Sequence, residues 1–136
     1  MVKVSEISND QLTKVAGWFK HYAGADFPLD VMGDFGFMAS VGDVDAAAVF
    51  FFPVVGANWC VIGWPVGNPE LDKADRGLAL DTVLLHAQKY AKELGYKYAT
   101  TWASHKTIED RFIKHGYAIG DKNVSHMVKL LGGNDG

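Results

Sequence analysis

The sequence predicts an α/β (α+β) fold, a mixed β-sheet flanked by helices in the order β-α-β-β-β-α-β-α-β. Segments rich in Val, Phe, Ile and Trp indicate buried strands. Two longer segments place apolar residues at helical spacing, and glycines follow them. With 136 residues, 49% of them hydrophobic, the chain fits one domain. We expect that domain over residues 1–131, followed by a flexible C-terminal tail over 132–136.

The front half of the chain predicts a strand, a helix and three further strands. Ser8 suits an N-cap, Gln11 three residues later completes a capping box, and Ile7 and Leu12 fit a hydrophobic staple. Gly56-Ala57-Asn58 suits a tight hairpin loop between the last two strands. The strands are expected at residues 2–7, 36–41, 46–55 and 59–66, and a helical turn is expected near 29–32.

Residues 46–69 carry no charge, and a run of this length could span a membrane. Pro53 and Pro65 would each remove a backbone hydrogen bond from a spanning helix, so two buried strands are the better interpretation. Consecutive residues of a strand point to opposite faces, so Phe50 to Phe52 require cover on both faces. Helices on both sides of the sheet are favoured, and a homodimer interface is the alternative.

The back half predicts helices separated by a strand. A helical stripe over residues 76–94 ends at Gly95, and a strand follows at 98–102. Ser104 can cap a helix that runs through His115 and ends at Gly116. One or two closing strands are expected within residues 117–131, with a turn at 120–123.

Charge and cysteine content exclude several classes of function. A net charge of −3 and a pI near 5.9 do not fit a partner that is a nucleic acid. Cys60 is the only cysteine, which excludes an intramolecular disulfide and a site of several thiolates, and its apolar strand predicts an inert thiol. The histidines have no metal-ligand spacing. We expect a cytoplasmic protein with no metal, no nucleic acid and no membrane partner.

One segment carries a specific resemblance. Ala74-Asp75-Arg76-Gly77-Leu78-Ala79 follows the uncharged strand and opens the long helix, and it resembles the diphosphate-binding loop of the GNAT family of N-acetyltransferases. Gly77 and Ala79 match the fourth and sixth positions of the family's Gln/Arg-x-x-Gly-x-Gly/Ala pattern. Ala74 departs from its first position, although Lys73 is adjacent. Residues 105–117 are similar to the family's last helix, with Phe112 in the place of a tyrosine.

The resemblance implies an acyl-CoA-dependent N-acyltransferase. Acetyl-CoA would lie between strands 59–66 and 98–102, and a primary amine of a small molecule or peptide would attack its thioester directly. The start of a helix independently suits an anionic phosphate. The alternative is that Asp72 and Asp75 cap an ordinary helix beside a solvated basic pair. The residues expected to bind the cofactor are Lys73, Ala74, Asp75, Arg76, Gly77, Leu78 and Ala79.

The sequence lacks some of the side chains that would be expected to donate or accept protons in this reaction. Phe112 has no proton to donate, and residues 46–66 contain no Asp, Glu or His. His105, Ser104 and Glu70 remain as candidates, with His105 first because histidine is the residue type that ordinarily exchanges protons near neutral pH; the alternative is an exposed first-turn histidine. A second hypothesis follows, a catalytically degenerate GNAT-fold protein that acts as a binding or structural component, for example one encoded by a phage.

Aromatic and acidic residues of the front half have two interpretations. The aromatic residues could line an acceptor pocket or pack in the core. The acidic residues could steer a cationic amine or be ordinary turn residues. The aromatic set is Trp18, Phe19, Tyr22, Phe27, Phe35 and Phe37, and the acidic set is Asp26, Asp30, Asp34, Asp43 and Asp45.

Overall fold

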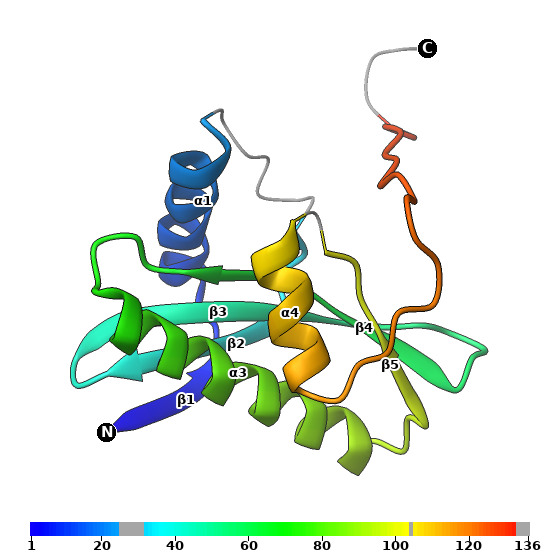
Figure 1. Ribbon diagram of the computed structural model, residues 1–136, viewed down its shortest axis with the longest axis horizontal. Helices are drawn as coiled ribbons and strands as arrows, with labels where there is room; N and C mark the ends of the chain where they lie inside the picture. The colour runs from blue at the N-terminus through cyan, green and yellow to red at the C-terminus, as the bar shows by residue number, and fades with distance from the viewer. Residues whose placement is uncertain (25–31, 104, 133–136) are drawn as a thin grey trace. The chain divides into compact units, whose positions relative to one another are not determined.

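The computed structural model describes residues 1–24, 32–103 and 105–132, in two units that cover residues 1–101 and 102–136 (Figure 1). The helical turn expected near 29–32 falls almost entirely outside the described residues. The expectation of one domain over 1–131 stays a prediction. The elements of the first unit are β1 (Val2–Glu6), α1 (Asn9–Ala23), β2 (Gly36–Val41), β3 (Val44–Pro53), β4 (Trp59–Gly67), α3 (Lys73–Glu93) and β5 (Tyr98–Thr100).

The strands form one mixed sheet in the order β1-β2-β3-β4-β5. The first four strands are joined by antiparallel pairing, from Val2 opposite Val41 to Pro53 opposite Cys60. β5 pairs with β4 in the parallel direction, because α3 carries the chain back between them. The mixed sheet flanked by helices that the sequence predicted is therefore confirmed.

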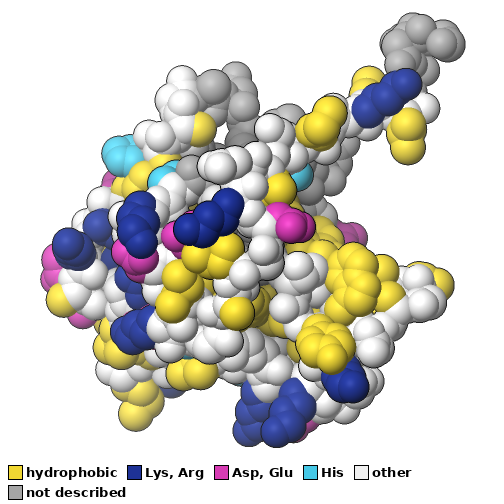
Figure 2. Space-filling view, turned by 45° about the vertical axis from the view of Figure 1, so that its right-hand side comes forward, with side chains coloured by type: hydrophobic (Ala, Val, Ile, Leu, Met, Phe, Trp, Pro, Cys, Tyr) yellow, Lys and Arg dark blue, Asp and Glu magenta, His cyan; other side chains and the backbone are white. Residues whose placement is uncertain are grey.

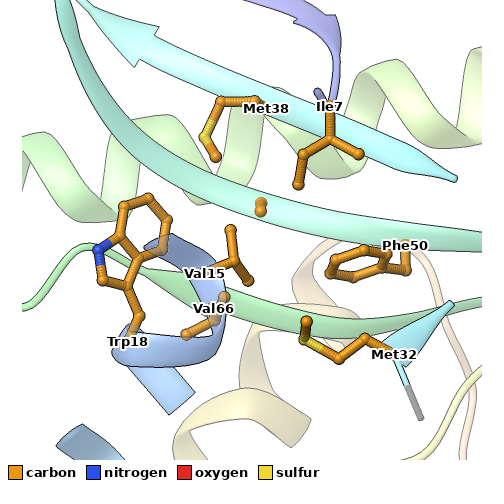
Figure 3. Close-up of a cluster of buried hydrophobic side chains, with 8 residues drawn as sticks. Ile7, Val15, Trp18, Met32, Met38, Phe50 and Val66 are labelled. Atoms are coloured by element: carbon orange, nitrogen blue, oxygen red, sulfur yellow. The ribbon is translucent and has the colours of Figure 1, made fainter. Parts of the chain in front are cut away.

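Helices cover both faces of this sheet, as the run of phenylalanines required. Phe50 lies in a buried cluster with Val15 and Trp18 of α1 (Figure 3). The next residue, Phe51, points to the other face, where its ring centroid lies 5.3 Å from that of Tyr90 of α3. The core is thus two apolar layers on either side of β3.

The local signals for α1 are confirmed. The Ser8 hydroxyl accepts from the Gln11 N–H at 3.3 Å, and the Gln11 side chain accepts from the Ser8 N–H at 2.9 Å. Ile7 and Leu12 both contribute to the cluster on this face. Two reciprocal hydrogen bonds therefore fix where α1 begins.

The second unit contains one helix, α4 (Lys106–Lys114). Its cap residue is His105, whose side chain makes no capping hydrogen bond; Ser104, the expected cap, lies outside the described residues. Gly116 follows the helix with φ of 94°, as predicted. Phe112 is buried and packs edge-on against Tyr117, with ring centroids 4.9 Å apart.

The closing strands expected within residues 117–131 are wrong for the part of the chain that the structure describes. The chain bends at residues 122–123, where Asn123 has φ of 59°, but residues 117–132 form no ladder. A strand needs a partner for its backbone groups, and an alternating sequence does not supply one. The large apolar side chains of this segment are accordingly exposed.

The boundaries near the predicted site also differ from expectation. α3 begins at Lys73 rather than at residue 76, because Asp72 is its N-cap. β5 ends at Thr100 rather than at residue 102. Gly95, with φ of 97°, follows α3 as predicted.

Replacing Phe50 by Ala tests the core on the α1 side. The side chain is fully buried, so its loss should lower the free energy of unfolding by about 3–5 kcal/mol, as measured by urea denaturation. Val55→Ala is the control, because Val55 is 99% exposed and should change the free energy by less than about 0.5 kcal/mol. Equal effects of the two substitutions would contradict this assignment of the core.

Candidate functional site

The second half of β4 has one edge without a strand partner. Parallel pairing with β5 runs only from Trp59 opposite Tyr98 to Val61 opposite Thr100. β5 ends there, whereas β4 continues to Gly67. Among the described residues, no strand pairs with this edge from residue 62 onward. A ligand that carries amide groups could pair with these backbone groups as a strand does.

A β-bulge lies in the same part of β4. Ala48 is opposite Val66 and Phe50 is opposite Gly63, so Val49 alone faces Trp64 and Pro65. Trp64 adopts φ of 55°, which is rare for a bulky side chain, and Pro65 has no N–H to offer a ladder. Such a bulge bends a strand and increases its twist. β4 is therefore bent where its pairing with β5 has ended.

The connection from β4 to α3 is held by Asn68, a buried side chain that the sequence analysis did not single out. Its amide nitrogen donates to the Asp45 carbonyl at 2.9 Å, and its amide oxygen accepts from the Glu70 N–H at 2.9 Å. The second bond is an Asx-type turn, and the Asn-Pro pair after an apolar strand is the sequence signal for it. The connection is thus tied to the start of β3.

The seven residues expected to bind the cofactor form the first two turns of α3 rather than a loop before it. Asp72 accepts from the Asp75 N–H at 2.8 Å, so the carboxylate cap weighed above is present. The N–H groups of Lys73 and Ala74 make no hydrogen bond within the described part of the chain. The start of α3 therefore presents these two N–H groups to a ligand, beside the carboxylates of Asp72 and Asp75.

Arg76 is held back against the connection. One guanidinium nitrogen donates to the Leu71 carbonyl at 2.9 Å, and the stem of the side chain lies so close to Gly67 that a Cβ there would collide with it. Tyr22 of α1 donates to the Gly67 carbonyl at 3.2 Å. Lys73 is exposed, whereas Ala79 is buried in the core. Arg76 is therefore held by a hydrogen bond to the connection, and Lys73 is the more accessible of the two cations.

The three candidates for proton transfer lie in different parts of the chain. Glu70 is exposed in the connection, three residues before α3 begins. His105 is exposed at the cap of α4 in the second unit, and Ser104 lies outside the described residues. Of the three, Glu70 is placed beside the cofactor-binding segment, because the connection that contains it leads directly into α3.

The aromatic residues considered for an acceptor pocket divide between the two faces of the sheet. Trp18 is buried on the α1 face, where Phe19 packs edge-on against Trp64 at 5.8 Å. Phe35 and Phe37 lie on the α3 face, each within 5.6 Å of the Tyr90 ring centroid. One pocket lined by all of them is therefore wrong. Phe27 lies outside the described residues.

Among the acidic residues considered for steering an amine, Asp45 is engaged within the first unit. It accepts from Lys14 at 2.7 Å, from Gln11 at 3.2 Å and from Ser40 at 3.3 Å. Asp34 and Asp43 are exposed. Asp26 and Asp30 lie outside the described residues.

A shallow depression of about 400 Å³ lies at the other end of β4. Trp59, Tyr98, Ala99 and Thr100 line it, roughly 25 Å along the strand from Gly67. Hydrophobic side chains reach the surface in this unit (Figure 2); Trp59 is 40% and Tyr98 57% exposed. The depression is thus separate from the start of α3.

Neither a metal-binding group of side chains nor a helix able to cross a membrane occurs among the described residues. No group of three or more His, Cys, Asp or Glu side chains there could hold a metal ion. None of the helices described combines the length and the apolar character that a membrane crossing requires.

The chain matches solved structures over nearly its whole length and theirs. One is an aminoglycoside acetyltransferase from an uncultured soil metagenomic sample in complex with sisomicin: 11% identity, TM-score 0.66, 96% of this chain and 97% of that one. This chain has the fold of the GNAT acetyltransferases. The GNAT-like fold that the sequence resemblance implied is therefore confirmed.

Two further structures share the GNAT fold. A ribosomal-protein-alanine N-acetyltransferase from Brucella melitensis biovar Abortus 2308 has 14% identity and a TM-score of 0.65 over 95% of this chain and 99% of that one. An aminoglycoside N-acetyltransferase in complex with CoA has 13% identity and a TM-score of 0.66 over 96% of each chain. No family model matches the sequence, and no curated protein matches it.

Cys60 tests the packing between β4 and β5. Burial raises the pKa of its thiol, a backbone hydrogen bond offsets part of that rise, and the thiol lies 3.7 Å from the Tyr98 carbonyl oxygen. Iodoacetamide should therefore label the folded protein at least about 100-fold more slowly at pH 7.5 than the chain unfolded in urea. Because the pKa is raised, the rate should still increase with pH above 9. Equal rates for folded and unfolded protein would contradict the burial.

Proposed function

We propose that this protein is an acyl-CoA-dependent N-acyltransferase that transfers an acetyl group from acetyl-CoA to a primary amine. The observation that carries the proposal is the parallel pair β4–β5, which ends at Val61 while β4 continues to Gly67 and leads into the start of α3. The acetyltransferases with this fold support it, because one is a CoA complex and another a sisomicin complex. The acceptor is proposed to be an amine of a small molecule or peptide.

The backbone of this chain supplies the groups that an acyl-CoA needs. The edge of β4 that no described strand pairs would offer amide and carbonyl groups to the amides of the pantetheine arm, and a strand N–H would stabilise the negative charge that develops on the thioester oxygen. The open N–H groups of Lys73 and Ala74, with the Lys73 ammonium, would receive the diphosphate.

The chemistry consists of one substitution at the thioester carbonyl. The amine nitrogen forms a bond to the acyl carbon, the carbon–sulfur bond breaks, and CoA leaves as a thiolate. A base takes one proton from the amine and an acid gives one to the thiolate. We propose Glu70, Ser104 and His105 for these transfers, since the buried Phe112 ring carries no titratable proton.

A catalytically degenerate binding protein with the same fold is the second candidate, and one observation favours it. The Asp72 carboxylate occupies the anion position at the first turn of α3, 2.8 Å from the Asp75 N–H, and the Asp75 carboxylate adds a second negative charge there. Both charges repel a diphosphate. If this repulsion prevails, acetyl-CoA will not bind.

Isothermal titration of the purified protein with acetyl-CoA tests the donor binding on which the transferase depends. We expect binding, and Lys73→Ala should weaken it about fivefold because an exposed cation next to a diphosphate contributes on the order of 1 kcal/mol. Lys89→Ala is the matched control, since Lys89 is an exposed lysine four turns farther along α3. No heat and no thermal shift with the unmodified protein would exclude the transferase.

The Asp72 carboxylate gives a test in the opposite direction. Asp72→Asn keeps an oxygen that can accept from the Asp75 N–H but removes the negative charge, so acetyl-CoA should bind about fivefold more tightly. Desulfo-CoA should gain to the same extent in the same titration, because the gain arises at the diphosphate. An unchanged dissociation constant would show that the diphosphate does not lie at this helix start.

A further inference from the structure

Asn68 is the buried polar side chain of the described residues, at 6% exposure, and all four of its hydrogen-bonding groups are used. Its backbone N–H donates to the Ala46 carbonyl at 2.8 Å, and its backbone carbonyl accepts from the Leu71 N–H at 3.2 Å. Its side chain joins the Asp45 carbonyl and the Glu70 N–H. A buried amide with every group satisfied fixes its surroundings in one geometry.

Asp45, whose carbonyl accepts from the Asn68 amide, is itself held in place. The Asp45 side chain is 15% exposed and is held by Lys14 and Gln11 of α1 and by Ser40 of β2. Asn68 therefore ties the connection to a residue that three other side chains hold.

The two residues of the connection that are hydrogen-bonded to Asn68 lead directly into the proposed donor site. The Glu70 N–H donates to the Asn68 side-chain oxygen, the Leu71 N–H donates to the Asn68 backbone carbonyl, and Asp72, the next residue, is the N-cap of α3. The Leu71 carbonyl in turn accepts from Arg76, so the position of the connection also sets that of the guanidinium. A shift of the connection would move the open N–H groups relative to the end of β4.

We propose that Asn68 is the positioning residue of the donor site; the inference rests on the proposed function. By bonding Asp45 and Glu70 at once, it sets the start of α3 at a fixed distance from the edge of β4 that no described strand pairs. The thioester arm and the diphosphate of one acyl-CoA molecule must reach both places together. Asn68 touches neither reacting group and acts through the backbone of the connection.

Asn68→Ala removes both side-chain bonds and should raise the dissociation constant of acetyl-CoA about tenfold, measured by isothermal titration at 15 °C. Asn68→Ser keeps an oxygen two residues before the Glu70 N–H, as serine does in such turns, but loses the amide bond to the Asp45 carbonyl, so its dissociation constant should lie about threefold above that of the unmodified protein. Asn58→Ala, an exposed asparagine in the β3–β4 loop, is the control.

Circular dichroism at the titration temperature and the Tm of each variant separate binding from stability. A role in stability alone would lower the Tm of Asn68→Ala and leave the affinity of the folded protein equal to that of the control, which would overturn the inference. Should Asn68→Ala not fold, a dissociation constant for Asn68→Ser equal to that of Asn58→Ala would overturn it. Absence of binding by the unmodified protein would instead overturn the proposed function, on which the inference rests.

Discussion

The burial of β3 on both faces is the constraint on which the rest of the structure depends. Residues 46–51 are uncharged and buried, and their side chains alternate between the two faces of the sheet. Each face needs its own helix, so α1 covers one and α3 the other. Because α3 must cross the sheet from the end of β4, the strand that follows it is parallel to β4. The parallel pair and the helix start beside it are thus consequences of packing.

Local signals in the sequence predicted the elements that local interactions determine. The capping box at Ser8, the strand at residues 36–41 and the helix ends at Gly95 and Gly116 need only neighbours in the chain. The strand expected at 46–55 is displaced by two residues, to Val44–Pro53, because its register depends on pairing with β2. Strands within residues 117–131 depend on a distant partner, and periodicity contains no information about one.

The candidate site was predictable as a place in the chain but not as a geometry. The sequence placed a possible anion site between the apolar strand and the long helix, and the helix does begin there. It did not reveal that Asp72 already occupies the first turn or that Arg76 turns back toward Leu71. Asn68 was missed because its importance lies in a hydrogen bond to Asp45, twenty-three residues away in the sequence. Contacts of this kind become visible only when the chain has folded.

The shortness of the β4–β5 ladder has a mechanical consequence. Three residue pairs hold the last strand, whereas β1, β2 and β3 are joined by longer ladders. Fewer bonds mean a smaller free energy for local opening, so amide hydrogens of β5 exchange with solvent before those of the central strands. The parallel end of the sheet is therefore the part that opens most readily, while the central strands keep their register.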